Sequence, residues 1–270
     1  MSQAEKAFKW VGTRQIRPDG VQKVTGRAKF GADHAWPGTL TGKILRSPHA
    51  HARIKSIDTS KAEALPGVKA VMTGADFPDH EFAYVGPERA AVNFWHISRN
   101  VMAKEKALYE GHAVAAVAAT SNAIAKKAVA LIEVDYEVLP HVIDVDEAMA
   151  EDAPLVFEDQ ITRGVEPAPT KPSNISKRVE FALGDVEAGF AEADEIVEKT
   201  FKTAAVHQGY IEPHATVARY DTDGQSEVWS ASQGHFQVRA LTSKITGIRL
   251  GDIRVTPAEI GGGFGGKTIV

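Results

Sequence analysis

The sequence predicts an α+β fold, because strand-like runs and helix-like segments are mixed without the strict βαβ alternation of a parallel sheet. From Ile16 to about Asp144, short runs rich in β-forming residues are bounded by turn signals, and two other segments have helical spacing. Of the 270 residues, 43% are hydrophobic and 24% are charged, which is enough for one large core or two modest ones.

Four strands and two helices are expected in the first half of the chain. A helix over residues 60–65 is ended by Pro66-Gly67, and a helix over residues 121–132 can be capped by the Ser121 hydroxyl. The first dozen residues have little periodicity and are expected to form a tail. The expected strands cover residues 39–45, 52–58, 68–73 and 113–120.

A linker and a second set of elements are expected after residue 150. The linker, residues 151–174, contains four prolines among few apolar residues. A helix over residues 184–193 and a long strand over residues 195–203 are expected next. The last expected elements are strands over residues 210–220 and 225–232 joined by an Asp223-Gly224 turn, a helix over residues 235–246 ended by Gly247, and a strand over residues 253–260.

Charge and cysteine content narrow the possible functions. With 31 basic and 35 acidic residues the net charge is −4, which argues against nucleic acid as a partner. The chain has no cysteine, so it forms no disulfide, thiolate zinc site or iron–sulfur cluster, and redox chemistry would need a non-protein cofactor. Its apolar runs are too short to span a bilayer and residues 1–10 do not resemble a signal peptide, so we expect a cytoplasmic protein without membrane insertion.

Residues 261–268 (GGGFGGKT) form a glycine loop after the last expected strand. The loop fits both G-x-x-x-x-G-K-[ST], the P-loop that holds nucleotide phosphates, and G-x-G-x-x-G. Both motifs need a helix directly after the loop to complete the phosphate site, and only Ile269 and Val270 follow in this sequence. A P-loop nucleotide-binding protein therefore stays as an alternative, as does a glycine-rich end left by truncation.

Six regions, which together span nearly the whole chain and follow the order of the family, resemble the molybdenum hydroxylases, the xanthine dehydrogenase and aldehyde oxidase family. The region nearest the end of the chain combines residues 229–233 (WSASQ) with residues 262–267 (GGFGGK) of the glycine loop. The others are residues 19–28 (DGVQKVTGRA), 45–54 (LRSPHAHARI), 110–115 (EGHAVA), 133–140 (EVDYEVLP) and 207–214 (HQGYIEPH).

The resemblance implies the N-terminal part of a molybdopterin-binding large subunit. The implied organisation is a tail at residues 1–15, a hammerhead domain at residues 16–150, a linker at residues 151–174 and an incomplete first molybdopterin-binding domain at residues 175–270. The family's general base lies in the C-terminal half of the large subunit. No catalytic residue is therefore expected in this chain, and the chain alone is expected to be inactive.

The resemblance also assigns residues to the cofactor. Gln233 corresponds to the glutamine beside the molybdenum ligands, where an amide can donate a hydrogen bond without competing as a charged ligand. Phe264 corresponds to the position whose backbone lies against the apical ligand of the metal. The glycines that let the main chain approach the cofactor are Gly262, Gly263, Gly265 and Gly266.

Two residues at the end of the loop bear on the substrate and the cofactor. Thr268 takes the place of a substrate-binding glutamate in purine-oxidising members, so xanthine is disfavoured while aldehydes, N-heterocycles and acyl-CoA-linked aromatics stay open. Lys267 is expected either to contact a cofactor phosphate or to be a solvated charge. His49 and His51 are expected to be loop or interface histidines, with a metal site as the alternative. Structural hydrogen bonds are expected for His207, Glu212 and His214, again with a metal site as the alternative.

The activity implied by the resemblance is oxidation of an aldehyde or of an aromatic or N-heterocyclic small molecule, with water as the oxygen source. The implied cofactor is molybdenum with molybdopterin, in the cytosine dinucleotide form of a bacterial three-subunit enzyme. The implied partners are the C-terminal part of the large subunit, an iron–sulfur small subunit with 2Fe-2S clusters and an FAD-containing medium subunit. A reductive member that removes a ring hydroxyl and a non-catalytic protein of the same fold stay as alternatives.

Overall fold

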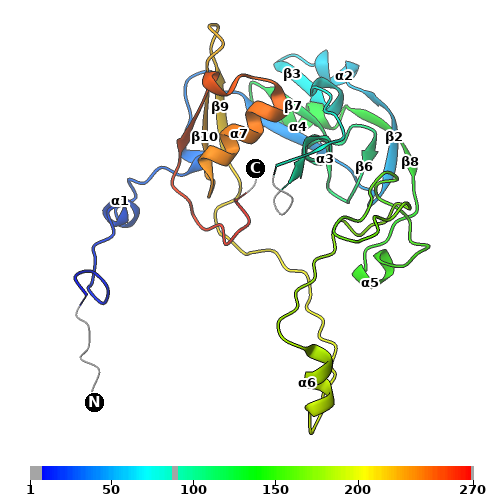
Figure 1. The fold of residues 1–270 in the computed structure, drawn as a ribbon. Coiled ribbons are helices and arrows are strands. Elements are labelled where there is room, and N and C mark those ends of the chain that lie inside the picture. The colour runs from blue at the N-terminus through cyan, green and yellow to red at the C-terminus, as the bar shows by residue number, and fades with distance from the viewer. Residues whose placement is uncertain (1–7, 87–90, 269–270) are drawn as a thin grey trace. The chain divides into compact units, whose positions relative to one another are not determined.

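The computed structural model describes residues 8–86 and 91–268 (Figure 1). The chain divides into two compact units, one formed by Gly38–Val206 and the other by Met1–Pro37 together with His207–Val270. Part of the expected tail, residues 1–7, lies outside the described residues. The domain boundaries expected after residues 15, 150 and 174 remain predictions.

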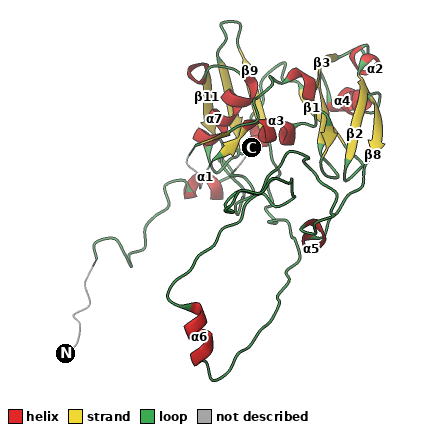
Figure 2. Cartoon of the chain, turned by 45° about the vertical axis from the view of Figure 1, so that its right-hand side comes forward, coloured by secondary structure: helices red, strands yellow, loops and turns green. Residues whose placement is uncertain are grey.

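The Gly38–Val206 unit contains two antiparallel three-stranded sheets (Figure 2). All four strands expected here are confirmed within two residues at each end. The first sheet has the order β1-β7-β3, from β1 (Thr41–Arg46), β7 (Ala113–Ala119) and β3 (Val68–Thr73). The second has the order β6-β2-β8, from β6 (Lys106–Ala107), β2 (Ala52–Asp58) and β8 (Glu133–Val138), and β4 (Tyr84–Val85) pairs separately with β5 (Val92–Asn93).

Small residues allow the helices of this unit to approach the first sheet closely. Helix α4 (Asn122–Val129) begins after Ser121, whose Oγ accepts a hydrogen bond from the Ile124 amide at 3.3 Å, as expected from the sequence. The short helix α2 (Ser60–Glu63) packs against α4 and β3. The buried core consists of Ala62, Ala115, Val117, Ala119, Ala125, Ala128 and Ile132.

The rest of this unit departs more from the expectations. Helix α3 (Phe94–Val101), the short α5 (Val145–Ala148) and the 3-10 turn η2 (Gly74–Asp76) are not predicted by the sequence reasoning, whereas α6 (Val186–Glu192) lies within the expected helix. The strand expected over residues 195–203 is wrong, because this segment has no regular structure and is exposed along its whole length. A strand needs a hydrogen-bonded neighbour, and no described segment provides one.

The second unit is built on a mixed sheet with the order β11-β10-β9. Strands β9 (Thr216–Tyr220) and β10 (Ser226–Ser230) are antiparallel across the expected Asp223-Gly224 turn, and β11 (Ile253–Pro257) is parallel to β10. Strand β9 covers only the second half of the strand expected over residues 210–220. Helix α7 (His235–Thr246) connects the parallel strands and ends at Gly247, whose φ of 77° confirms it as the expected terminating glycine.

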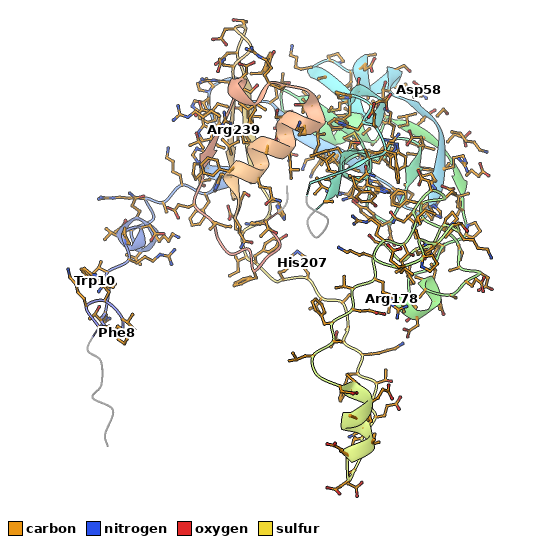
Figure 3. The ribbon with its side chains drawn as sticks, in the orientation of Figure 1. Phe8, Trp10, Asp58, Arg178, His207 and Arg239 are labelled. Atoms are coloured by element: carbon orange, nitrogen blue, oxygen red, sulfur yellow. The ribbon has the colours of Figure 1, made fainter. Side chains whose placement is uncertain are left out.

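The beginning of the chain adds to the second unit. Helix α1 (Gly20–Val24) and the 3-10 turn η1 (Gly31–Asp33) precede an isolated parallel bridge between Phe30 and Glu259. Arg239 of α7, labelled in Figure 3, donates hydrogen bonds from Nε to the carbonyls of Leu250 and Ile253. These bonds tie α7 to the 3-10 turn η4 (Leu250–Asp252) and to the start of β11.

Across the described part of the chain, no helix combines the length and the apolar character that crossing a membrane requires.

Candidate functional site

The parallel pairing of β10 and β11 brings together residues 229–233 and residues 262–267, the two segments that resemble the cofactor-facing part of the family. The strands are in register from Ser226 with Ile253 to Ser230 with Pro257, so their carboxyl ends lie at the same edge of the sheet. The chain leaves β10 through Ala231-Ser232-Gln233 and leaves β11 toward the glycine loop. Loops at the carboxyl ends of parallel strands commonly form ligand sites.

Gln233 is hydrogen-bonded to the glycine loop through both its backbone and its side chain. Its amide N–H donates to the carbonyl of Lys267 at 2.8 Å, and its Oε1 accepts from the amides of Gly265 at 3.1 Å and Lys267 at 3.3 Å. Ser232 Oγ adds a further hydrogen bond to the Lys267 carbonyl. These contacts orient the amide group of Gln233, and its Nε2 has no hydrogen-bond acceptor among the described residues.

The glycine loop depends on the absence of side chains at the point where it meets Gln233. A Cβ atom on Gly263 would lie 2.5 Å from Gln233 Oε1, which is closer than any carbon–oxygen contact allows. Phe264 has a φ of 48°, and it is the one non-glycine residue with positive φ in the described part of the chain. Such strain in a bulky residue marks a constrained site, and the Phe264 side chain is 74% exposed.

Several backbone N–H groups of the glycine loop have no acceptor among the described residues, so they can bind a ligand that is rich in hydrogen-bond acceptors. The amides of Gly262, Gly263 and Phe264 donate to no acceptor among the described residues, while the Gly265 amide is used by Gln233. Successive free N–H groups in a loop with left-handed backbone form a favourable site for anionic oxygens. Together with Gln233 Nε2, these groups form a donor set that fits the oxygen ligands and phosphate of a molybdopterin cofactor.

An ion pair between Lys267 and Glu212 holds the glycine loop in place. Lys267 is 0% exposed, and its Nζ lies 2.8 Å from Glu212 Oε2 and 4.9 Å from the centroid of the Tyr210 ring. Glu212 also accepts hydrogen bonds from the amides of Gly261 at 2.6 Å and Gly31 at 3.2 Å. One carboxylate therefore contacts both ends of the glycine loop and the segment from the beginning of the chain.

Glu212 stays ionised because its partners outweigh its burial. Burial alone would raise the pKa of this carboxyl, but hydrogen bonds from Lys267 Nζ and from the Gly261 and Gly31 amides lower its pKa overall below the usual range. An ion pair with hydrogen bonds to its remaining oxygen positions meets the requirement for a stable buried charge.

The position of Lys267 corrects one expectation from the sequence. This lysine is not a solvated charge, because its ammonium group is buried against Glu212 and Tyr210. The P-loop alternative needs the corresponding lysine to reach nucleotide phosphates, and here the ammonium group is already paired. The pair is not predictable from the sequence because 55 positions separate its members; the one signal for Glu212 is its position within a segment that resembles the family.

The other expected site residues have local partners. Thr268 Oγ1 donates to the Gly265 carbonyl at 2.8 Å and its side chain is exposed. His207 Nδ1 accepts from the Gly209 amide at 3.0 Å, and the His214 ring lies 5.4 Å from that of Tyr210. In the other unit, His51 Nδ1 is 2.9 Å from the Pro140 carbonyl and the His49 ring packs edge-on against Tyr136. Within residues 8–86 and 91–268, no three His, Asp or Glu side chains gather as a metal-ligand group.

Two family profiles match the chain. Residues 25–140 match the profile described as aldehyde oxidase and xanthine dehydrogenase, a/b hammerhead domain. Residues 167–270 match the profile described as molybdopterin cofactor-binding domain.

Known proteins of this kind align with nearly the whole chain. It is 37% identical to the carbon monoxide dehydrogenase large chain of Afipia carboxidovorans, over 98% of this chain and 32% of that protein. It is 35% identical to a probable xanthine dehydrogenase subunit of Bacillus subtilis, over 94% of this chain and 31% of that protein. The crystal structure of quinoline 2-oxidoreductase from Pseudomonas putida 86 has a TM-score of 0.78 and 32% identity, covering 95% of this chain and 31% of that chain.

The two matched regions follow each other in the order expected from the sequence, the hammerhead domain before the molybdopterin cofactor-binding domain. The chain spans about a third of the length of these relatives. Through the hammerhead match over residues 25–140 and the molybdopterin cofactor-binding match over residues 167–270, the chain belongs to the aldehyde oxidase and xanthine dehydrogenase family.

Proposed function

We propose that this chain forms part of a molybdenum-dependent hydroxylase that oxidises an aldehyde, or an aromatic or N-heterocyclic molecule, with water as the oxygen source. The observation that carries the proposal is the attachment of Gln233 to the glycine loop, which leaves one side-chain amide and three backbone amides without acceptors among the described residues. When bound, the molybdopterin cofactor supplies the two-electron oxidation of the substrate.

In this proposal the residues of the chain bind and orient the cofactor. Gln233 Nε2 would donate a hydrogen bond to the oxygen ligands of the metal, with the amide group oriented by the contacts of Oε1 with the Gly265 and Lys267 amides. The free amides of Gly262, Gly263 and Phe264 would donate to acceptors of the cofactor. Gly266 lets the loop pack against Tyr210 and Gln208, because a Cβ there would lie 2.8 Å and 3.0 Å from their side chains.

The substrate proposal rests on Thr268. Its hydroxyl is neutral and donates to the Gly265 carbonyl, so it offers no charge with which to bind a purine. The electron path includes 2Fe-2S clusters and FAD on partner chains, the cofactor has the cytosine dinucleotide form, and the general base comes from the rest of the large subunit. The absence of cysteine supports the placement of the clusters on other chains.

Replacement of Gln233 in the assembled enzyme tests the proposal. We expect Gln233→Ala to lower kcat by about a hundredfold to a thousandfold, which is the usual effect of removing one donor to the reacting centre. Molybdenum content should stay close to that of the unchanged enzyme, since the backbone donors remain. The matched control is Gln237→Ala, an exposed glutamine of α7 four residues further along, which should retain full turnover.

Two results would contradict the proposal. Unchanged turnover in Gln233→Ala would show that this side chain does not act at the metal. Binding of ATP or GTP to the unchanged protein, abolished in Lys267→Ala without loss of folding, would favour the P-loop alternative instead.

A further inference from the structure

A pocket of about 500 Å³ lies beside helix α3, which is labelled in Figure 1. All the residues that line it belong to the Gly38–Val206 unit, and none belongs to the glycine loop. Its walls come from the pair of strands β4 and β5, from the first turn of α3 and from residues 156–176. A volume of this size is typical of sites for small molecules.

The wall formed by residues 156–176 is held in place by hydrogen bonds. Asn174 Nδ2 donates to two backbone carbonyls at 3.0 and 3.1 Å, and its Oδ1 accepts from the Val156 amide at 3.0 Å. The Ser173 amide donates to the Gln160 carbonyl at 2.9 Å. A ligand that enters a pocket with fixed walls does not have to order them, so less of its binding free energy is lost.

The lining of the pocket is free of charge. Among the described residues, none that lines it is Asp, Glu, Lys or Arg. Its histidine, His96, packs edge-on against Phe157 with ring centroids 4.5 Å apart. Burial outweighs the opposing effect of Asp159 and lowers the pKa of the His96 imidazole below its ordinary value, so the ring is neutral near pH 7. A charged ligand would lose its hydration in this pocket without gaining a counter-charge.

Aromatic side chains form much of the lining. The Tyr84 ring is fixed on one face by the Arg163 guanidinium, 3.9 Å from its centroid, and its hydroxyl donates to Gln160 Oε1 at 3.3 Å. The rings of His96 and Phe157 line the pocket as well, and aliphatic side chains of β5 and α3 complete its apolar surface. Flat aromatic molecules make favourable stacked and edge-on contacts with such rings.

Asn93 supplies a hydrogen-bond donor at the pocket. This residue lines the pocket and is 4% exposed, and its Oδ1 accepts from the Trp95 amide at 2.9 Å at the start of α3. Because an N–H group points at Oδ1, the other atom of the amide group is the nitrogen. Nδ2 is buried and makes no hydrogen bond to a described residue, a state that is costly unless another molecule supplies the acceptor. The ring nitrogens of His96 also form no hydrogen bond of normal geometry with a described residue.

We propose that this pocket binds a neutral aromatic molecule that carries an oxygen acceptor, of the class of aromatic amides. The ring system of the ligand lies among Tyr84, His96 and Phe157, and its carbonyl oxygen accepts from Asn93 Nδ2. A neutral imidazole has one donor and one acceptor nitrogen, so His96 can accept the N–H of the amide. The site uses none of the residues assigned to the molybdopterin cofactor and is therefore independent of the proposed function.

Two probes of almost the same shape test the charge of the ligand. We expect 2-naphthamide to bind to the natively purified protein in equilibrium dialysis at pH 7. The carboxylate 2-naphthoate should bind at least about tenfold more weakly, because the lining offers no counter-charge. Equal affinity for the two probes would overturn the proposed class of ligand.

A larger side chain in the wall tests the position of the site. Ile97 is a half-buried residue of α3 that lines the pocket, and Ile97→Trp should weaken the binding of 2-naphthamide by at least about tenfold, because the indole occupies the same space. The matched control is Val101→Trp, at an exposed position at the end of the same helix that does not line the pocket. It should retain the affinity within about twofold, and circular dichroism of both variants checks that they are folded.

Asn93→Ser tests the hydrogen bond without removing the helix cap, because a serine oxygen can accept from the Trp95 amide in the same way. Loss of the Nδ2 donor should weaken the binding of 2-naphthamide by about threefold to tenfold. Asn122→Ser, at an exposed asparagine in the first turn of α4, is the control and should leave the affinity unchanged.

Three results would overturn the proposal. The first is equal affinity of the unchanged protein and a folded Ile97→Trp variant for 2-naphthamide. The second is unchanged affinity in Asn93→Ser, which would show that Nδ2 donates to water instead of the ligand. The third is loss of binding in Phe264→Ala while Ile97→Trp binds normally, which would place the probe at the glycine loop.

Discussion

Glu212 and Lys267 form the residue-scale feature on which the glycine loop depends. The carboxylate contacts the amides of Gly261 and Gly31 as well as the buried ammonium group, so it joins three segments that are distant in sequence. Removal of one member of a buried ion pair leaves the other charged and without a partner, which costs more than the pair itself contributes. The loop should therefore be sensitive to either residue.

Lys267→Met is expected to destabilise the protein by about 3 to 5 kcal/mol, because Glu212 would remain buried without its counter-ion. Urea unfolding of the variant and of the unchanged protein measures this difference. Lys244→Met, an exposed lysine in the last turn of α7, is the control and should change stability by less than about 0.5 kcal/mol. Equal stability of the two variants would show that the buried pair contributes nothing.

The acid stability of the protein should depend on Glu212. Its pKa in the folded protein is lowered below the ordinary value of 4.5, so its contribution is complete above that pH and is lost as the pH falls through the folded pKa. Unfolding temperatures measured from about pH 6 to about pH 3.5 should therefore fall more steeply for the unchanged protein than for Glu212→Gln. Parallel curves for the two proteins would contradict the assignment.

Some of the site is predictable from single residues and some is not. Gln233 and the loop glycines stand out because a glutamine after a strand and a glycine cluster after the next strand recur in a resembling family. The partner of Lys267 is not predictable in this way, since ion pairs between distant segments leave no local pattern. The burial of Lys267 follows from the packing of three segments, which only the tertiary structure provides.

At the scale of elements, the parallel register of β10 and β11 positions Gln233 against the loop. Gly263→Ala should disturb this contact, because its Cβ would lie 2.5 Å from Gln233 Oε1 and one of the two groups must shift. We expect turnover of the assembled enzyme to fall by about tenfold to a hundredfold, as for displacements of about 1 Å near a reacting centre. Gly251→Ala, at a glycine of η4 with no atom within 4 Å, is the control and should leave turnover unchanged. Full activity in both variants would contradict the role of this contact.

The elements that sequence patterns predict best are those completed within the described chain. The helix after Ser121, the turn at Asp223-Gly224 and the helix ended by Gly247 all follow from local capping and turn chemistry. Strand β8 is not predicted as an element, although the alternation of acidic and apolar residues over Glu133–Val138 is typical of a half-buried strand. The strand expected over residues 195–203 shows the opposite error, since its alternation is present while its pairing partner is not.

At the scale of the whole molecule, the chain spans about a third of the length of its relatives. Large apolar side chains between residues 179 and 206 are exposed and are not covered by other described residues. The sequence predicts two folded regions and places the glycine loop at the end of a strand. It does not indicate which surfaces form contacts with other polypeptide chains. That information lies in residue exposure, which only the folded structure defines.

The most direct test of the central claim is the molybdenum and pterin content of the protein purified from its source, together with the masses of the polypeptides that co-purify. We expect close to one molybdenum per chain and a partner polypeptide that supplies the rest of the large subunit. Protein that is free of molybdenum and pterin, purified under conditions in which another molybdenum enzyme of the same cells is fully loaded, would contradict it.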